Sequence, residues 1–249
     1  MVKVAFVVGD YPPAERKRRE EVALSYSTAG VEVGIVSVAA TAYLHGLTPA
    51  EIQLAATPFI EAFRDAERQG YDAVVPLGML DLGVDGGRSA VDIPVIGPCE
   101  ASLYVASLLG DRIGGIVYHD KLLPMTRAIV RRHGMEHKIA GWRTSGFDLP
   151  DLAANHDAVV RNFVEGARAL VKEHDADVII PMEGILAEVL ASQGIKEIDG
   201  AVIMDGIGVP VMVAEMNAKL WKRTGTRVGR HWTYERADAA TMLHYYPKK

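Results

Sequence analysis

The sequence predicts an α/β protein whose mainly parallel sheets are flanked by helices. Short runs rich in Val and Ile alternate with longer segments in which apolar residues recur at helical spacing. The short runs are almost continuously apolar, which is typical of strands buried on both faces of a sheet. The helical segments between them supply the crossover connections that a parallel sheet requires.

A weak internal repeat relates the two halves of the chain. Residues 72–77 (DAVVPL) and 177–182 (DVIIPM) share an Asp, an apolar run and a Pro, and an X-Pro-Val segment follows each, at 93–95 and 209–211. Two βαβ units can be similar by chance, but the repeat also fits two pseudo-symmetric lobes facing each other across a cleft. The expected boundaries are residues 1–98 with about 213–249 for the first lobe, and 99–212 for the second.

The elements follow from these patterns in chain order. Thr48 before Pro49 is a plausible N-cap for a long helix, because Thr accepts a backbone N–H there and Pro suits the first helical turn. We expect strands at residues 2–8, 31–38, 73–77, 93–97, 114–118, about 138–142, 178–180, 201–204 and 210–213. We expect helices at residues 49–69, 99–109, 121–133, about 155–173, after Gly184 and at 214–223, and then a polar tail.

Composition and charge argue against several classes of protein. The net charge is −5, whereas a general nucleic-acid binder is basic. No stretch approaches the roughly 18 uncharged apolar residues of a membrane helix, and no signal peptide is recognisable, so we expect a cytoplasmic protein with no membrane partner. The single cysteine, Cys99, excludes an intramolecular disulfide and a Cys-rich zinc site.

The candidate site residues directly follow the predicted strands. Ligands of open α/β sheets bind outside the carboxyl ends of the strands, so these residues would face one cleft. Gly and Asp are also favoured in turns, which is the plainer interpretation of Gly9-Asp10 and Asp205-Gly206. The candidates are Asp10 and Tyr11; Gly78, Met79 and Asp81; Tyr118 and His119; and Glu183 and Gly184.

Glu183 is the strongest of these candidates. It interrupts an apolar run where a strand meets a helix, so it could simply be stabilised by the helix dipole. In a cleft, partial burial would instead raise its pKa and make it a general acid or base. His119 ends another strand, where it is either a hydrogen-bonded surface group or a proton-transfer group.

Other site types are weakly supported. No Gly-x-Gly-x-x-Gly, P-loop or Gly-x-Ser-x-Gly motif is present. His119, Glu183 and an Asp could in principle hold a metal, but their spacing carries no metal signature. The basic run 16–19 lies between glutamates; it is most simply the solvated start of a helix, although it could line a site for an anionic group or a subunit contact.

Several segments resemble the aspartate/glutamate/hydantoin racemase superfamily, and most closely its hydantoin racemase branch. The resemblance extends from residue 1 to about 223 and leaves the tail from about 225 to 249 uncovered. The segments that carry it are 72–85 with 91–97, Glu100-Ala101-Ser102, 178–184 and the Gly-Val-Pro-Val segment 208–211, which matches the closing strand of the family.

The resemblance implies two pseudo-symmetric α/β lobes with the active site between them, no cofactor and a homo-oligomer. Racemases of this family use two cysteines, one from each lobe, to remove and replace a proton next to a carbonyl. Here the first cysteine position falls on Gly78 and the second on Glu183, while Cys99 lies elsewhere and is expected to be a buried small residue.

The leading hypothesis is therefore a cofactor-independent enzyme that acts on a small carboxylate or cyclic amide. Glu183 would be the acid/base, assisted by His119 or Tyr118, with Asp81 as an opposed carboxylate. An isomerisation, elimination, decarboxylation or hydrolysis would fit one carboxylate better than two-thiol racemisation. The alternatives are a non-catalytic ligand-binding or accessory relative and a metal-assisted hydrolase. The remaining candidates, Asp10, Tyr11, Gly78, Met79, Tyr118 and Gly184, are expected to bind substrate.

Overall fold

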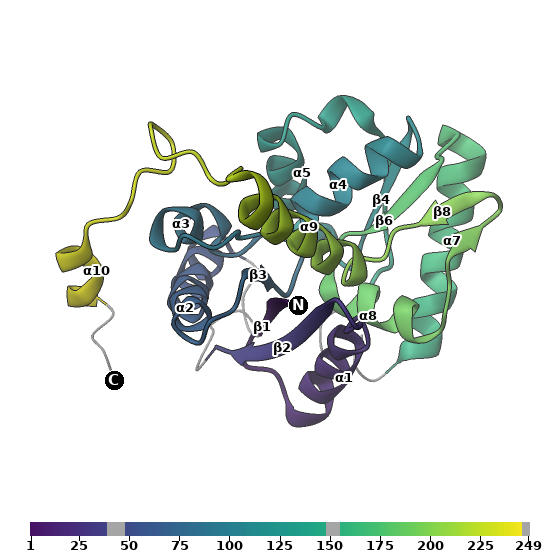
Figure 1. The fold of residues 1–249 in the computed structure, drawn as a ribbon. Coiled ribbons are helices and arrows are strands. Elements are labelled where there is room, and N and C mark those ends of the chain that lie inside the picture. The colour runs from purple at the N-terminus through teal and green to yellow at the C-terminus, as the bar shows by residue number, and fades with distance from the viewer. Residues whose placement is uncertain (39–47, 148–154, 246–249) are drawn as a thin grey trace.

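The computed structural model describes residues 1–38, 48–147 and 155–245 and consists of two α/β lobes, each built on its own sheet (Figure 1). The first lobe holds a three-stranded sheet and the second a five-stranded sheet. The predicted fold class is therefore confirmed. Among the described residues, no helix is both long enough and apolar enough to span a membrane.

The first lobe is a parallel sheet in the order β2-β1-β3. Alternate residues of β1 face opposite cores: Val4 and Phe6 pack with α9, whereas Ala5 and Val7 pack with α2. Both faces of the sheet are thus covered, which explains why the strand is almost wholly apolar. The elements are β1 (Val2–Val8), α1 (Pro13–Leu24), β2 (Val31–Ser37), α2 (Pro49–Arg68), β3 (Ala73–Pro76) and α3 (Val84–Ala90), with α9 (Gly208–Thr224).

The second lobe has the strand order β5-β4-β6-β8-β7, parallel except for the short β7. Helix α7 packs on β4 and β5, and α4 packs on β6. The elements are α4 (Pro98–Leu109), β4 (Ile113–Val117), η2 (Asp120–Leu122), α5 (Leu123–Arg132), η3 (Glu136–Lys138), β5 (Ile139–Thr144), α7 (His156–His174), β6 (Val178–Pro181), α8 (Gly184–Ser192), β7 (Glu197–Ile198) and β8 (Ala201–Ile203). A last helix, α10 (Ala239–Tyr245), ends the described chain.

The internal repeat corresponds to equivalent strands in the two lobes. Asp72 accepts the backbone N–H of Lys3 at 2.9 Å, which ties the start of β3 to β1. Asp177 accepts the N–H groups of Asp111 and Arg112, each at 3.0 Å, which ties the start of β6 to the start of β4. In each lobe the shared Asp therefore accepts backbone N–H groups at the start of its strand, as expected for two pseudo-symmetric lobes.

Two expected strands are wrong. At 93–97 there is only an isolated parallel bridge between Val95 and Val74, because Pro94 has no N–H with which to extend a ladder. The segment expected as a strand at 210–213 is instead the first turn of α9. Asp205 accepts the N–H groups of Ile207 at 3.0 Å and Gly208 at 2.8 Å, which starts that helix, and Pro210 is tolerated within its first turn.

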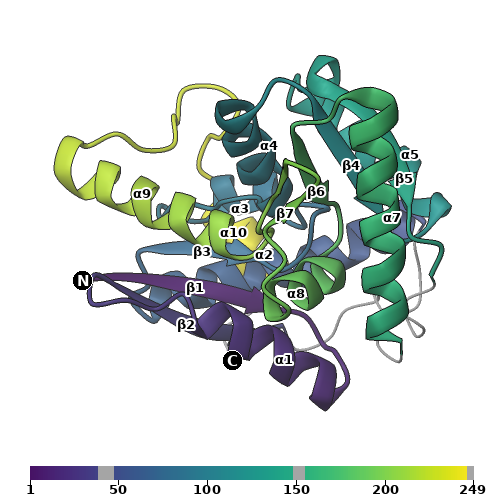
Figure 2. The same cartoon turned by 90° about the vertical axis from the view of Figure 1, so that its right-hand side faces the viewer.

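The lobes are joined by packing as well as by the chain. Met79 follows β3 of the first lobe but belongs to the core of the second. Helix α1 packs against α8, and the two lie side by side at the junction (Figure 2). Helix α9 returns from the second lobe to cover β1 and β3 and also packs on α4. The carboxyl ends of β3 and β6 are consequently held against each other.

We expect Gly87→Ala to lower the free energy of unfolding by about 1–3 kcal/mol, because a Cβ there would lie 2.5 Å from the Phe63 ring between α3 and α2. Gly30→Ala is the matched control, since its Cβ would meet no atom within 4 Å. Urea denaturation measures both changes. An equal loss in the two variants would mean that the close packing of α3 on α2 does not contribute to stability.

Candidate functional site

The candidate site lies where the first-lobe strand β3 meets the second-lobe helix α8. A Cβ built on Gly184 would lie 3.6 Å from the Cα of Gly78 and 3.2 Å from Cδ1 of Leu77. Gly184 is buried and follows β6 directly. The two positions at which the resemblance places cysteines, 78 and 183, therefore lie close together on opposite lobes.

Gly78 contributes open space to this junction. Its φ is +109°, a backbone conformation that residues with a Cβ rarely adopt. A Cβ added there would nevertheless meet no atom within 4 Å. The backbone conformation at position 78 thus favours glycine, and a cysteine there would need a different loop conformation. The glycine also leaves room beside Gly184.

Glu183 is buried at the first turn of α8, with 4% of its surface exposed. Its carboxylate accepts the N–H of Leu186 at 2.9 Å and caps the helix. The helix dipole and this amide both favour a negative charge at that position. The capping role noted from the sequence is therefore present, and the carboxylate also lies beside the opposite lobe.

Tyr118 and His119 end β4, the neighbour of β6. The register pairs Ile116 with Pro181, so its extension places Tyr118 level with Glu183. Tyr118 is fully buried. Nδ1 of His119 accepts the N–H of Lys121 at 3.0 Å, which leaves the proton of the neutral ring on Nε2. His119 can therefore act as a hydrogen-bond donor through Nε2.

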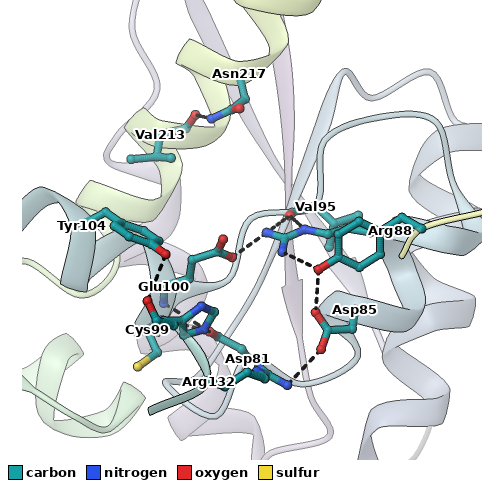
Figure 3. A network of polar contacts seen from close by, with 12 residues as sticks. Asp81, Asp85, Arg88, Val95, Cys99, Glu100, Tyr104, Arg132, Val213 and Asn217 are labelled. Carbon is teal, nitrogen blue, oxygen red and sulfur yellow. Dashed lines mark hydrogen bonds and ion pairs between the residues drawn. The ribbon is translucent and has the colours of Figure 1, made fainter. Parts of the chain in front are cut away.

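Asp81 is held by helix α4 (Figure 3). Its Oδ1 accepts the N–H of Cys99 at 2.8 Å, and its Oδ2 accepts the N–H of Glu100 at 3.1 Å and lies 3.3 Å from Nε2 of His133. Burial raises the pKa of Asp81, opposed by these hydrogen bonds and the charge of His133. Because a Cβ at Gly97 would lie 2.6 Å from Cγ of Asp81, this approach depends on a glycine.

Cys99 is fully buried in the first turn of α4. Burial and the nearby Asp81 carboxylate raise the pKa of its thiol well above the ordinary value. The thiolate, which is the reactive form, is therefore strongly disfavoured. The position agrees with the expectation of a buried small residue.

The loop after β1 carries Asp10, which is exposed, and Tyr11, which is partly buried. The guanidinium carbon of Arg19 lies 4.2 Å from the centroid of the Tyr11 ring. Burial raises the pKa of Tyr11, the charge of Arg19 lowers it, and that of Glu183 raises it again, so these three groups lie within electrostatic range of one another. The sequence indicated the basic run 16–19 but did not single out Arg19.

Among the described residues, no group of three or more His, Cys, Asp or Glu side chains is arranged to hold a metal ion. The residues suggested for a metal site are used differently: Glu183 caps α8, and His119 accepts an amide through Nδ1. The candidate groups are the Glu183 carboxylate, the neighbouring glycines 78 and 184, and the pair formed by Tyr11 and the buried Arg19.

We expect Asp81→Asn to lower the free energy of unfolding by about 1–3 kcal/mol, because an amide group in place of one carboxylate oxygen leaves a buried N–H of α4 without an acceptor. Chemical denaturation measures the loss. Asp92→Asn is a suitable control, since Asp92 is exposed and its carboxylate bonds to Arg230 and Arg236 at the surface. Unchanged stability of Asp81→Asn would show that this cap is unimportant.

The folded protein should react slowly with a thiol reagent such as DTNB at neutral pH and fully after unfolding, because Cys99 is its only cysteine and is buried. Cys99→Ala should retain turnover. Rapid labelling of the native protein, or loss of turnover without loss of fold, would contradict a purely structural thiol.

Known proteins match both the sequence and the fold. A sequence profile described as Asp/Glu/hydantoin racemase matches residues 27–204. The hydantoin racemase of Pseudomonas sp. (strain NS671) is 28% identical over 165 residues, which are 66% of this chain and 66%, just under two thirds, of that relative. The hydantoin racemase of Rhizobium meliloti is 27% identical over 206 residues, 78% of this chain and 81% of the relative.

The solved structure of allantoin racemase from Klebsiella pneumoniae superposes with a TM-score of 0.84 at 20% identity, covering 96% of this chain and 94% of that chain. At that identity the likeness concerns the fold, and it agrees with the two lobes described above. The profile match, in contrast, extends over most of the sequence and across both lobes. The chain therefore belongs to the Asp/Glu/hydantoin racemase family.

Proposed function

We propose that this protein is a cofactor-independent enzyme that moves a proton on one side of a small carboxylate or cyclic amide, with Glu183 as the acid/base group. The observation that carries the proposal is the pairing of positions 183 and 78. Glu183 is buried and is followed by Gly184, and a Cβ built on Gly184 would lie 3.6 Å from the Cα of Gly78, where the backbone borders open space.

One base and one open space favour a different chemistry from that of two opposed thiols. Racemisation by two bases needs a proton acceptor on one face of the substrate and a donor on the other. Here the first lobe offers no ionisable group at position 78, because that residue is a glycine. A single carboxylate suits an isomerisation in which one group removes and returns the proton, a decarboxylation followed by protonation, an elimination, or attack by a water that Glu183 activates.

The neighbouring groups support this assignment of roles. His119 presents an Nε2–H that can donate to a developing oxyanion, and Tyr118 lies level with Glu183 on the adjacent strand. The open backbone at Gly78 offers space for a substrate oxygen. We assign Asp81 a positioning role instead of a catalytic one, because its oxygens already hold α4 and contact His133.

The substrate class follows from the relatives and the site together. The two matched relatives are named hydantoin racemases, and a hydantoin is a cyclic amide with an acidic C–H next to a carbonyl. A carboxylate base at the lobe junction is suited to such a proton. Asp10 and Tyr11, on the loop after β1, would contact the part of the substrate that extends into the first lobe, while Met79 packs beneath the site in the core.

The test uses the exchange of hydrogen for deuterium, which reports proton removal whatever product is formed. A panel of small carboxylates, hydantoins and lactams is incubated with the protein in D2O, and NMR follows both exchange and new products. We expect Glu183→Gln to slow the reaction by about 10²–10⁴-fold, because general acid–base catalysis contributes that much. Glu197→Gln, on the exposed side of β7, is the matched control and should react normally.

Near-normal turnover by Glu183→Gln would contradict the proposal. Binding of panel compounds by the unmodified protein without exchange or product formation would favour the ligand-binding interpretation. Loss of turnover on treatment with a chelator would favour the metal-assisted hydrolase.

A further inference from the structure

Arg19 is a fully buried cation of which only one part is hydrogen-bonded. It lies in the second turn of α1, and none of its side chain is exposed. Nη1 donates to the backbone carbonyl of Glu15 at 2.6 Å and to the carboxylate of Glu15 at 3.1 Å. Nε and Nη2 are also buried, but no acceptor among the described residues lies within hydrogen-bond distance of either.

Nε and Nη2 form one edge of the Arg19 guanidinium. Leaving this edge buried without hydrogen-bond acceptors destabilises the folded protein unless another group bonds to it. A buried charge that has lost its water and gained too few partners destabilises a protein, and buried Arg is normally paired. The Nε and Nη2 groups of a guanidinium point in parallel and match the two oxygens of a carboxylate. The unsatisfied part of Arg19 is therefore the part that binds a carboxylate best.

The neighbouring side chains do not supply the missing acceptor. Glu15 is shared between Arg19 and Arg18. Glu188 of α8 lies 3.7 Å from Nε of Arg18, and its buried Oε2 has no hydrogen-bond partner among the described residues, so it does not bond to Arg19. Burial raises the pKa of Glu188, whereas the charges of Arg19 and then Arg18 lower it. His156, at the start of α7, provides no negative charge, and burial with the two arginines lowers its pKa. Arg19 is thus left with an unused donor edge between α1, α7 and α8.

Contacts through Tyr11 and α8 connect Arg19 with Glu183, the proposed acid/base group. Its guanidinium carbon is 4.2 Å from the centroid of the Tyr11 ring, and Tyr11 directly follows the β1 turn at the carboxyl end of the first sheet. The charges of Arg19 and Glu183 both act on Tyr11, from opposite lobes. Helix α1, which carries Arg19, packs against α8, whose N-cap is Glu183 (Figure 2).

We propose that Arg19 binds a carboxylate group of the substrate through Nε and Nη2, so that the substrate of this enzyme is an anion. The proposal rests on the proposed function, since it assigns the anchoring end of a substrate whose reacting end meets Glu183. It narrows the proposed substrate class from carboxylates and neutral cyclic amides to compounds that carry a carboxylate. The aromatic face of Tyr11 holds the guanidinium in place from one side.

The test compares each carboxylate with its neutral amide. Malonate with malonamide and succinate with succinamide are used as probes, and calorimetry or thermal shift measures binding to the full chain. We expect at least one carboxylate to bind roughly a hundredfold more tightly than its amide, as a desolvated bidentate ion pair allows. Arg19→Lys keeps the charge but loses the planar fork, and it should remove most of this preference.

The control variant is Arg168→Lys on α7, whose side chain is 61% exposed and pairs with Asp199 at the surface; it should retain the preference. Equal binding of carboxylates and amides by the unmodified protein, or no binding of either carboxylate, would overturn the proposal whether or not the variants fold. A preference that survives in Arg19→Lys would also overturn it.

The proposed function is tested separately by Glu183→Gln. If that variant loses deuterium exchange but still prefers carboxylates, both proposals stand. If it retains exchange while Arg19→Lys loses the preference, the assignment of Glu183 fails and that of Arg19 stands.

Discussion

The close approach of Gly78 to Gly184 is the contact on which the rest of the site depends. Segments that follow a strand in each of the two lobes meet there, with the Leu77 side chain beside the two glycines. A Cβ at 184 would be tight against the Leu77 side chain, at 3.2 Å, and a side chain at 78 would be strained by the φ of +109°. The two glycines therefore allow the segment that carries Glu183 to approach the loop after β3 and leave open space at position 78.

Under the proposed function, this arrangement would replace the two thiols that the resemblance places at positions 78 and 183. In the two-thiol scheme each lobe contributes the same kind of group, so the site is chemically symmetric. In this chain the second lobe contributes an ionisable carboxylate held by a helix N-terminus, and the first contributes a glycine. Under the proposed function, asymmetry of this kind would direct proton transfer to one face of the substrate. The remaining thiol, Cys99, lies in the first turn of α4 beneath the Asp81 cap, where burial suppresses its ionisation.

Local sequence patterns predicted most of the fold and only part of the site. The strands of both sheets, except the two-residue β7, and the capped helix at Thr48 follow from apolar runs and capping residues, which act over a few residues. The segment 210–213 was predicted wrongly because its composition suits a strand, whereas Asp205 supplies the acceptor that begins a helix there. Glu183 was recognisable because a charge interrupts an apolar run. The capping of α4 by Asp81 could not be recognised from the sequence, because the helix that it caps begins 17 residues later in the chain.

Arg19 shows why burial is hard to infer from a charged run. Four consecutive basic residues between glutamates suggest a solvated surface, and Lys17 is indeed exposed. The buried residues of α1 are Glu15, Arg19 and Ala23, spaced by four, so one face of the helix turns inward against α8 and carries one of these cations with it. The spacing was visible in the sequence, but the partner helix was not.

The buried charged groups of the two lobes have opposite signs. The first lobe supplies the cation Arg19 and the aromatic ring of Tyr11, and the second supplies the carboxylate Glu183. A negatively charged substrate bound beside Glu183 alone would be repelled, because two carboxylates would share one poorly solvated space. A guanidinium on the opposite lobe offsets that repulsion and leaves the carboxylate near enough to accept a proton. If both proposals hold, a buried cation and a buried anion on different lobes would allow an acid/base carboxylate to act on an anion.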